Sequence, residues 1–382
     1  MQILIAPNAF KNSLPADQVA TALAAGLKES SLPCSLCCFP IGDGGDGTVE
    51  LLISHLGLKS IAVDTVDPFG RPIKGKYGYD PQTATAYIEM ADASGIRLLA
   101  TEELNPMQAN SVGTGWMLKD ALDQGAKHVV LGLGGSATVD GACGMLSALG
   151  VEFLDKEGNA LKVFPQQLLK LDKIDVSGLD ERMKYCQFTV LTDVKNRLLG
   201  KKGAAFVFGP QKGASSDEVE VLDDFLEHLN CVWSTQLGKD AGQLAGGGAA
   251  GGVAAGLWAV VDAAIMDGID YFLESTGFDE ELKKANLLIT GEGSIDLQTL
   301  DGKGPFGVAH RAKSLQIPTI GVGGAIPLAV DERLAAYFDV LIPINHHVAP
   351  FDELKICTFE NLRRTGKLIG ELLQLGLKKT VK

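Results

Sequence analysis

The sequence has few positive charges and no long hydrophobic run. Its 382 residues include 34 Lys and Arg against 47 Asp and Glu, which gives a formal net charge of -13. Nucleic acids and anionic membranes bind proteins through clustered Lys and Arg, so this balance argues against both as partners. No apolar stretch approaches the ~20 residues of a membrane-spanning helix, and the first residues lack the apolar core of a secretory signal. We therefore expect a cytoplasmic protein.

Long charge blocks, repetitive tracts and internal repeats are also absent from the sequence. The residues are 46% apolar and 21% charged, which suffices for a sizeable core and indicates a globular protein. The seven cysteines are odd in number and scattered, as expected of reduced thiols rather than a disulfide framework. Cys34, Cys37 and Cys38 have no second cluster that would complete a zinc site, and we expect them on a buried strand instead.

Short apolar stretches, glycine-rich polar loops and helical patterns follow one another along the chain. Strands that alternate with helices predict an α/β fold of parallel sheets with helices on both faces. At roughly 150 residues per domain, the length favours two domains. Ligands of such sheets bind at the carboxyl ends of the strands. The polar residues in the corresponding loops are Asn8, Lys11, Ser13, Asp43, Asp46, Ser136, Asp140, Asp193, Glu292 and Lys303.

The first of these loops, PNAFKNSLPADQ, offers an anion site. Ser13 stands at the expected N-cap of the next helix, whose free backbone N–H groups can bind an anion, and Lys11 would add a positive charge. The alternative is that Ser13 only caps the helix and that Lys11 is solvated.

The loop GDGGDGT, residues 42–48, is acidic although it is rich in glycine. Glycines let a backbone approach a ligand closely, but Asp43 and Asp46 would repel a phosphate. Either a divalent cation lies between carboxylate and phosphate, or one aspartate accepts a proton or hydrogen bond from the hydroxyl of a second substrate. A turn held by aspartate side chains is the structural alternative.

The loop GLGGSATVDG fits two kinds of anion site. It matches G-x-G-x-x-A at Gly132, Gly134 and Ala137 after a predicted strand, with Asp155 near the end of the next apolar run, which is a weak dinucleotide-binding signal. It also resembles the Gly-Ser loop of small-metabolite kinases, in which backbone amides hold phosphate. The P-loop pattern G-x-x-x-x-G-K-[ST] is absent from the sequence.

Further carboxylates and one lysine follow predicted strands. Asp193 in LTDVKN and both Glu292 and Asp296 in TGEGSID are of the kind that holds magnesium beside phosphates. Lys303 precedes Pro305 at a helix start, where a cation and a helix N-terminus could bind an anion together, unless it is simply solvated. The Gly/Ala-rich residues 243–256 suit either a linker or close backbone packing.

Six motifs occur in the order typical of the bacterial glycerate kinase family, of the glycerate 2-kinase type, which the sequence resembles. They are APNAFKNSL (6–14), DGGDGT (43–48), GLGGSATVDGACGM (132–145), LTDVKNRLLG (191–200), FGPQKGA (208–214) and TGEGSIDLQTLDGKGPFGVA (290–309). The resemblance implies ATP-dependent phosphorylation of D-glycerate with magnesium, and 2-phosphoglycerate is the expected product. We expect a monomer or a homodimer.

The resemblance also implies the domain organisation. A Rossmann-like domain would be built from both chain ends, 1–62 plus 285–382, and a flavodoxin-like domain from residues 63–284, with a cleft between them. The sequence departs from the family pattern where many members have Asp, Arg, Asn and Pro. These positions are Asn8, Leu104, Val139 and Arg197. If Leu104 replaces a ligand of the substrate carboxylate, either the acid substrate differs or another cation takes that place.

We assign roles at the matched positions by their chemistry. The predicted catalytic residues are Lys11, Asp43 and Asp193, with Asp43 or Asp46 receiving the hydroxyl proton. The predicted substrate-binding residues are Asn8, Ser13, Asp46 and Ser136. The predicted nucleotide-binding residues are Gly134, Gly135, Thr138, Gly291 and Lys303. The predicted magnesium ligands are Asp193, Glu292 and Asp296. The alternatives are a kinase for another small hydroxy acid or polyol, and a dinucleotide-binding oxidoreductase or sensor.

Overall fold

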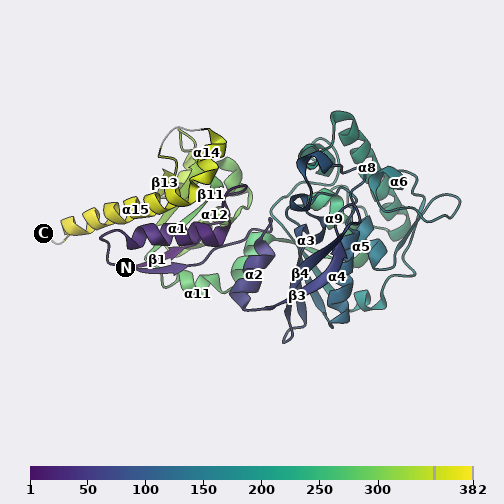
Figure 1. The fold of residues 1–382 in the computed structure, drawn as a ribbon, viewed down its shortest axis with the longest axis horizontal. Coiled ribbons are helices and arrows are strands. Elements are labelled where there is room, and N and C mark those ends of the chain that lie inside the picture. The colour runs from purple at the N-terminus through teal and green to yellow at the C-terminus, as the bar shows by residue number, and fades with distance from the viewer. Residues whose placement is uncertain (347–349, 381–382) are drawn as a thin grey trace. The chain divides into compact units, whose positions relative to one another are not determined.

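The computed structural model describes residues 1–346 and 350–380, which form two compact units (Figure 1). Unit 1 comprises Met1–Asp43 and Ile269–Lys382, and unit 2 comprises Gly44–Gly268. Unit 1 is therefore assembled from both chain ends, whereas unit 2 is continuous. In each unit helices cover a sheet, so the predicted two-domain α/β class is confirmed.

Unit 1 is built on a five-stranded parallel sheet in the order β13-β12-β11-β1-β2. The strands are β1 (Gln2–Ile5), β2 (Ser35–Cys38), β11 (Leu287–Ser294), β12 (Thr319–Ala325) and β13 (Val340–Pro343). The helices are α1 (Ala16–Lys28), α10 (Gly268–Ser275), α11 (Phe278–Leu282), α12 (Gly304–Ser314), α13 (Glu332–Ala335), α14 (Phe351–Ile356) and α15 (Thr358–Thr380), with the 3-10 helix η5 (Leu297–Asp301). Because the strands are parallel, the loops that follow them meet at one edge of the sheet.

The helices α1 and α15 pack together along one face of this sheet (Figure 1). Each contributes a glycine to the contact, because a Cβ on Gly26 would lie 1.8 Å from the carbonyl oxygen of Arg363 and a Cβ on Gly366 would lie 2.4 Å from that of Leu23. The two backbones can therefore approach closely, and the apolar side chains around them form the core of unit 1.

The edge strand β2 carries the cysteine cluster of the sequence. Cys34 and Cys37 are half-buried and Cys38 is exposed, so the expectation of a buried strand there is wrong. The strand has a neighbour on one side only, and the seven cysteines of the chain are all free thiols. Across the described residues no helix is both long and apolar enough to cross a membrane.

Unit 2 is built on a six-stranded sheet in the order β10-β9-β6-β5-β4-β3. The strands are β3 (Lys59–Val66), β4 (Pro72–Asp80), β5 (Thr85–Glu89), β6 (His128–Gly132), β9 (Gln187–Thr192) and β10 (Ala264–Asp267), and a separate antiparallel pair is formed by β7 (Glu152–Leu154) and β8 (Lys173–Asp175). The helices are α2 (Thr48–Leu56), α3 (Ala91–Ser94), α4 (Val112–Asp123), α5 (Cys143–Ala148), α6 (Pro165–Leu168), α7 (Ala204–Phe208), α8 (Ser216–Leu237) and α9 (Ala249–Val261). The 3-10 helices are η1 (Ile96–Leu98), η2 (Thr101–Glu103), η3 (Glu181–Lys184) and η4 (Pro210–Lys212).

The expectation of parallel strands fails for β3 and β4, which pair antiparallel with each other, as β4 does with β5. The cause is the short turn between β3 and β4. Asp67 Oδ1 accepts hydrogen bonds from the backbone of Phe69 and Arg71, both at 2.9 Å, and Gly70 has a φ of 82°. So short a connection cannot contain the crossover helix that parallel strands require.

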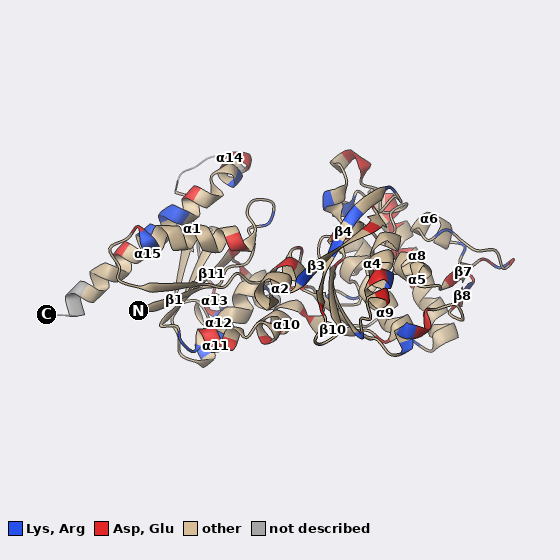
Figure 2. Cartoon of the chain, turned by 60° about the horizontal axis from the view of Figure 1, so that its bottom comes forward, with Lys and Arg blue, Asp and Glu red and all other residues tan. Residues whose placement is uncertain are grey.

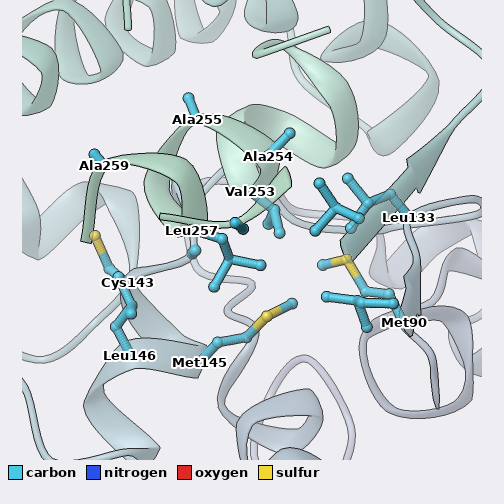
Figure 3. Close-up of a cluster of buried hydrophobic side chains, with 14 of the residues drawn as sticks. Met90, Leu133, Cys143, Met145, Leu146, Val253, Ala254, Ala255, Leu257 and Ala259 are labelled. Carbon is cyan, nitrogen blue, oxygen red and sulfur yellow. The ribbon is translucent and has the colours of Figure 1, made fainter. Parts of the chain in front are cut away.

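The Gly/Ala-rich stretch enters the core of unit 2 as α9 (Figure 3). Val253 and Leu257 of this helix belong to the same buried cluster as Met145. A Cβ on Gly256 would lie 2.0 Å from the carbonyl oxygen of Gly141. The close-packing interpretation is therefore confirmed, and the linker interpretation is wrong.

Charged side chains of both signs are interspersed in the view of Figure 2. Arg363 on α15, for example, pairs with Glu29 at 2.6 Å and with Glu360 at 2.7 Å. These side chains are largely exposed, so each pair adds at most about 1 kcal/mol to stability. The cores of the two units, rather than their ion pairs, hold the fold together.

We expect Gly256→Ala to lower the free energy of unfolding by at least about 2 kcal/mol, because the new methyl group would overlap the Gly141 backbone. Gly376→Ala on α15 is the matched control, since a Cβ there has no atom within 4 Å and Ala favours a helix over Gly by about 0.5–1 kcal/mol. Urea unfolding measures both. Equal stability of the two variants would contradict this packing.

Candidate active site

Four charged side chains meet at the carboxyl edge of the sheet in unit 1. Glu292, near the end of β11, is buried and interacts electrostatically with Lys303, Asp43 and Lys11. The Nζ atom of Lys303 lies 3.8 Å from Oε2 of Glu292. Beside them, Nδ2 of Asn8 donates a 2.6 Å hydrogen bond to Oδ2 of Asp43. Loops that follow β1, β2 and β11 thus bring predicted site residues from both chain ends together.

The Glu292 carboxyl group has an unusual proton affinity. Burial raises its pKa to about 7, and the charge of Asp43 acts in the same direction. The charges of Lys303 and Lys11 and a 2.8 Å hydrogen bond from the Thr299 hydroxyl to Oε1 act in the opposite direction. Glu292 can therefore exchange its proton near neutral pH or give it up to a cation that binds there.

Lys303 stands at the N-cap of α12, as its sequence context predicts. Gly302 before it has a φ of 110°, and Pro305 occupies the first turn. The first N–H groups of α12 and the Lys303 ammonium therefore share one end of the helix, where an anion would be favoured. A Cβ on Gly304 would lie 3.0 Å from Nδ2 of Asn8, so this helix start adjoins the Asn8–Asp43 pair.

Gly291 has a structural reason to be glycine. A Cβ there would lie 2.2 Å from the carbonyl oxygen of Val322 on the neighbouring strand β12. Close packing of β11 and β12 therefore accounts for this glycine, and its nucleotide-binding role stays a prediction.

Ser13 does not cap α1, so that expectation is wrong. The N-cap is Pro15, and Ser13 lies in a turn in which its backbone N–H donates to the carbonyl oxygen of Phe10 at 2.9 Å. The Ser13 hydroxyl lies instead 3.0 Å from the carbonyl oxygen of Lys355 and 2.7 Å from Oγ1 of Thr358, and its single hydrogen can be donated to either. Ser13 ties the first loop to the helices near the end of the chain.

The predicted magnesium ligands have different local partners. Asp296 caps η5, since Oδ1 accepts from the Gln298 N–H at 2.8 Å and Oδ2 accepts from the Ser294 hydroxyl at 3.1 Å. Asp193 directly follows β9 in unit 2. No three His, Cys, Asp or Glu side chains within residues 1–346 and 350–380 gather as a metal site. Magnesium usually takes only one or two carboxylates and keeps its waters and phosphates as further ligands, so Glu292 fits that pattern.

In unit 2 the two glycine-rich loops pack backbone to backbone. A Cβ on Gly134 would lie 2.1 Å from the amide nitrogen of Asp46, and Gly135 has a φ of 69°. The Asp46 carboxylate pairs with Arg97, with Nη1 3.1 Å from Oδ1, and Arg97 also contacts Asp92. Asp46 therefore has a cationic partner in its own unit, which explains how an acidic loop is accommodated there.

The loop after β6 also contacts a buried lysine that the sequence reasoning missed. Lys212 Nζ donates to Oγ of Ser136 at 2.8 Å and to the carbonyl oxygen of Thr138 at 2.7 Å. Burial lowers the pKa of Lys212 to about 7, although the charge of Asp140 opposes this shift. The signal was present in the FGPQKGA motif, where a lysine stands among glycine and proline.

Asp140 locks the same loop to the neighbouring helices. Its Oδ2 atom accepts hydrogen bonds from Ser111, through the backbone N–H at 2.8 Å and the hydroxyl at 2.7 Å, and from the Gly144 N–H at 3.1 Å. Burial raises the pKa of Asp140, and these hydrogen bonds partly offset the shift. Ser111 is a further residue of this site that the sequence reasoning missed.

The local fold is not that of a dinucleotide-binding unit. The helix α5 begins at Cys143 instead of at the GLGGSA loop, and the next strand, β7, pairs with β8 outside the main sheet. Asp155 lies in an exposed turn, where it accepts hydrogen bonds from Asn159. A dinucleotide fingerprint needs a helix that starts at the loop and a parallel strand that carries the acidic residue, so this interpretation is wrong.

A third missed residue is Glu89, at the end of β5. Its side chain is buried, and Oε2 accepts a 3.0 Å hydrogen bond from the Val49 N–H in the first turn of α2. Its Oε1 atom has no hydrogen-bond partner among the described residues. Burial raises the pKa of Glu89 to about 8, opposed by the Val49 hydrogen bond.

Comparisons with known proteins agree with the motif order. Residues 3–374 match the family model described as the glycerate kinase family. The chain is 39% identical to a glycerate kinase of Bacillus subtilis over 98% of each chain, and 37% identical to the glycerate 2-kinase of Escherichia coli over 99% of each chain. It also superposes on a crystal structure of glycerate kinase 2 from Salmonella typhimurium with a TM-score of 0.82, at 38% identity and 99% coverage of each chain.

We expect Glu89→Gln to remove a pH dependence of stability. The folded wild-type carboxyl group holds its proton up to about pH 8, whereas the unfolded one loses it near pH 4.3. In this interval the native state binds more protons, so the wild-type free energy of unfolding falls as the pH rises. Between pH 5 and pH 8, the free energy of unfolding of the variant should rise by at least about 1 kcal/mol relative to that of the wild type.

Denaturant unfolding at pH 5, 6, 7 and 8 measures this difference. Glu102→Gln on the exposed helix η2 is the matched control and should follow the wild type at every pH. A constant difference between Glu89→Gln and the wild type would show that Glu89 is ionised in the native protein throughout this range.

Proposed function

Because the chain belongs to the glycerate kinase family, we propose that it transfers the γ-phosphoryl group of ATP to D-glycerate and releases ADP and phosphoglycerate. The glycerate 2-kinase among its relatives supports the 2-hydroxyl as the acceptor and 2-phosphoglycerate as the product. The observation that carries the proposal is the cluster of Lys11, Asp43, Glu292 and Lys303 around one edge of the unit 1 sheet.

Phosphoryl transfer needs positioned reactants and neutralised charge more than covalent help from the protein. Lys303 and the start of α12 combine an ammonium group with free backbone N–H groups, which suits the phosphates of ATP. Lys11 is a second cation within the electrostatic reach of Glu292. We therefore assign both lysines to the charge that develops on the transferred group.

Glu292 is the carboxylate that we propose for magnesium. When held there, magnesium would supply positive charge that offsets part of the negative charge of the phosphates. Glu292 would give up its proton to hold the cation, as its pKa of about 7 permits. Asp296 accepts one hydrogen bond at each carboxylate oxygen, from the Gln298 N–H and from the Ser294 hydroxyl, so it retains free lone pairs and stays a predicted ligand. Asp193 stays a predicted ligand and catalytic residue at the end of β9.

Asp43 is the aspartate of the GDGGDGT loop that we propose as the base. Asp46 is paired with Arg97, whereas Asp43 lies with the Glu292 cluster. The Asn8 amide holds Oδ2 of Asp43 and so fixes the orientation of the carboxylate. Asp43 would accept the hydroxyl proton of glycerate as the new phosphate ester bond forms.

The loop at residues 133–138 is the second anion site of the proposal. Ser136 and the backbone of Gly134, Gly135 and Thr138 would hold either the glycerate carboxylate or phosphate oxygens. We place the reaction in the cytoplasm, since the seven cysteines are free thiols as in a reducing compartment.

The activity is tested by a panel of hydroxy acids and small polyols with MgATP. We expect ADP release to depend on D-glycerate, and phosphorus NMR to place the new phosphate on the 2-hydroxyl. Faster turnover of another acid would identify that acid as the substrate. Asn8 and Leu104 depart from the family pattern and bear most directly on the choice of acid. ADP release without a phosphorylated acid in any reaction would overturn the proposed function.

Asp43→Asn should lower kcat by about 10²- to 10⁴-fold, because the amide cannot accept the hydroxyl proton. The KM for ATP should stay within a few-fold of the wild type. Glu50→Gln on α2 is the control and should retain most of the turnover, since the Glu50 carboxylate pairs with Lys76 and not with the Glu292 cluster. Steady-state kinetics with D-glycerate give both constants, and unchanged kcat in Asp43→Asn would remove Asp43 from the role of base.

A further inference from the structure

Lys212 is buried in unit 2 in a way that stability alone does not explain. Only 2% of the residue is exposed, at the end of the 3-10 helix η4. No carboxylate in the described part of the chain lies within ion-pair distance of its Nζ atom. A buried ammonium group without a paired anion costs free energy, and an apolar residue of similar size would serve the packing better.

The hydrogen bond from Lys212 determines in which contacts the Ser136 hydroxyl group accepts and in which it donates. An ammonium group can only donate, so the 2.8 Å contact makes Oγ of Ser136 an acceptor. The hydroxyl hydrogen of Ser136 must then point to another acceptor. A second donation from Lys212, to the carbonyl oxygen of Thr138 at 2.7 Å, keeps the ammonium group beside this loop.

The backbone of the loop is held by other contacts and does not need Lys212. The Ala137 N–H donates to the carbonyl oxygen of Ser94 at 2.9 Å, and the Ile96 N–H donates to that of Gly135 at 2.8 Å. Asp140 anchors the far end of the loop to Ser111. Removal of the ammonium group should therefore change the Ser136 hydroxyl and the local charge while the loop stays in place.

We infer that Lys212 is a positioning residue that holds the Ser136 hydroxyl as a donor to an anionic group of a substrate and adds positive charge at that site. The anion is a carboxylate or a phosphate oxygen, since both accept such a hydrogen bond. This inference rests on the proposed function, in which the 133–138 loop binds either the glycerate carboxylate or the phosphates of ATP.

The protonation of Lys212 gives the inference a pH signature. Its pKa is lowered to about 7 by burial, and Asp140 is the described charged side chain that opposes this. A neutral amine can accept a hydrogen bond from Ser136, which would turn the hydroxyl away from the substrate. Binding of the anion should therefore weaken as the pH rises through 7. Lys212→Arg should remove this weakening, because a guanidinium stays protonated.

The test compares wild type, Lys212→Met, Lys212→Arg and Ser136→Ala, with Lys201→Met, an exposed lysine of the same segment, as the control. The KM values for D-glycerate and for MgATP are measured from pH 6 to pH 9, and the Kd values by calorimetry. We expect Lys212→Met to raise the KM of one substrate about tenfold or more at pH 6 and to abolish its pH dependence. A rise for D-glycerate identifies a carboxylate, and a rise for MgATP identifies a phosphate.

Ser136→Ala should raise the same constant, and adding Lys212→Met to it should bring little further loss, because both act through one hydroxyl group. The Ser136→Ala variant tests the inference even if Lys212→Met fails to fold. Wild-type KM and Kd values in Ser136→Ala at every pH would overturn the inference. Equal KM, Kd and pH profiles in Lys212→Met and wild type would overturn it as well. A wild type without D-glycerate-dependent ADP release would overturn the proposed function instead, and Lys212 would then be judged by the two Kd values.

Discussion

The candidate site depends on one electrostatic constraint, which is that a carboxyl group buried at a strand end must be compensated by cations or must keep its proton. Glu292 satisfies both conditions in part, with Lys303 at 3.8 Å, Lys11 within electrostatic reach and a pKa of about 7. Such a group is well suited to bind and release a divalent cation. The parallel sheet supplies the arrangement, because the loops after its strands meet at one edge.

One lysine and one glutamate of particular interest occur in each unit, and their electrostatic environments differ between the two units. In unit 1, Lys303 and Glu292 are close enough to interact, and each reduces the cost of burying the other. In unit 2, Lys212 and Glu89 are each buried and have no ion-pair partner among the residues that the structure describes, and burial shifts their pKa values toward neutrality from opposite sides. The arrangement in unit 1 favours charged side chains that can bind a polyanion. The arrangement in unit 2 keeps side chains whose charge can change near neutral pH.

The order of the sequence motifs predicted the family, the α/β class and the residues Lys11, Asp43, Glu292 and Lys303, which the structure brings together. Pattern reasoning works there because glycines and charged residues after apolar strands have few other uses. Glu89 could not be found in this way, because its interest lies in burial, and burial depends on contacts between distant segments. Lys212 stands in the FGPQKGA motif, but the motif does not show that this lysine is buried. Ser13 was misplaced because a local turn before Pro15 moved the helix start. The antiparallel β3–β4 pair was missed because the turn at Asp67 was not recognised.

The construction of unit 1 from both chain ends has a consequence for biosynthesis. The strand β1 lies between β2 and β11, and α1 packs against α15 through Gly26 and Gly366. The ribosome makes β1, α1 and β2 first, but the partners β11 and α15 emerge only after the whole of unit 2. Unit 2 is continuous and can fold during translation. Until β11 and α15 are made, the amino-terminal segment exposes the apolar face of α1 and an unpaired edge of β1. Nascent chains of this protein therefore have an extended period in which chaperones can bind that segment.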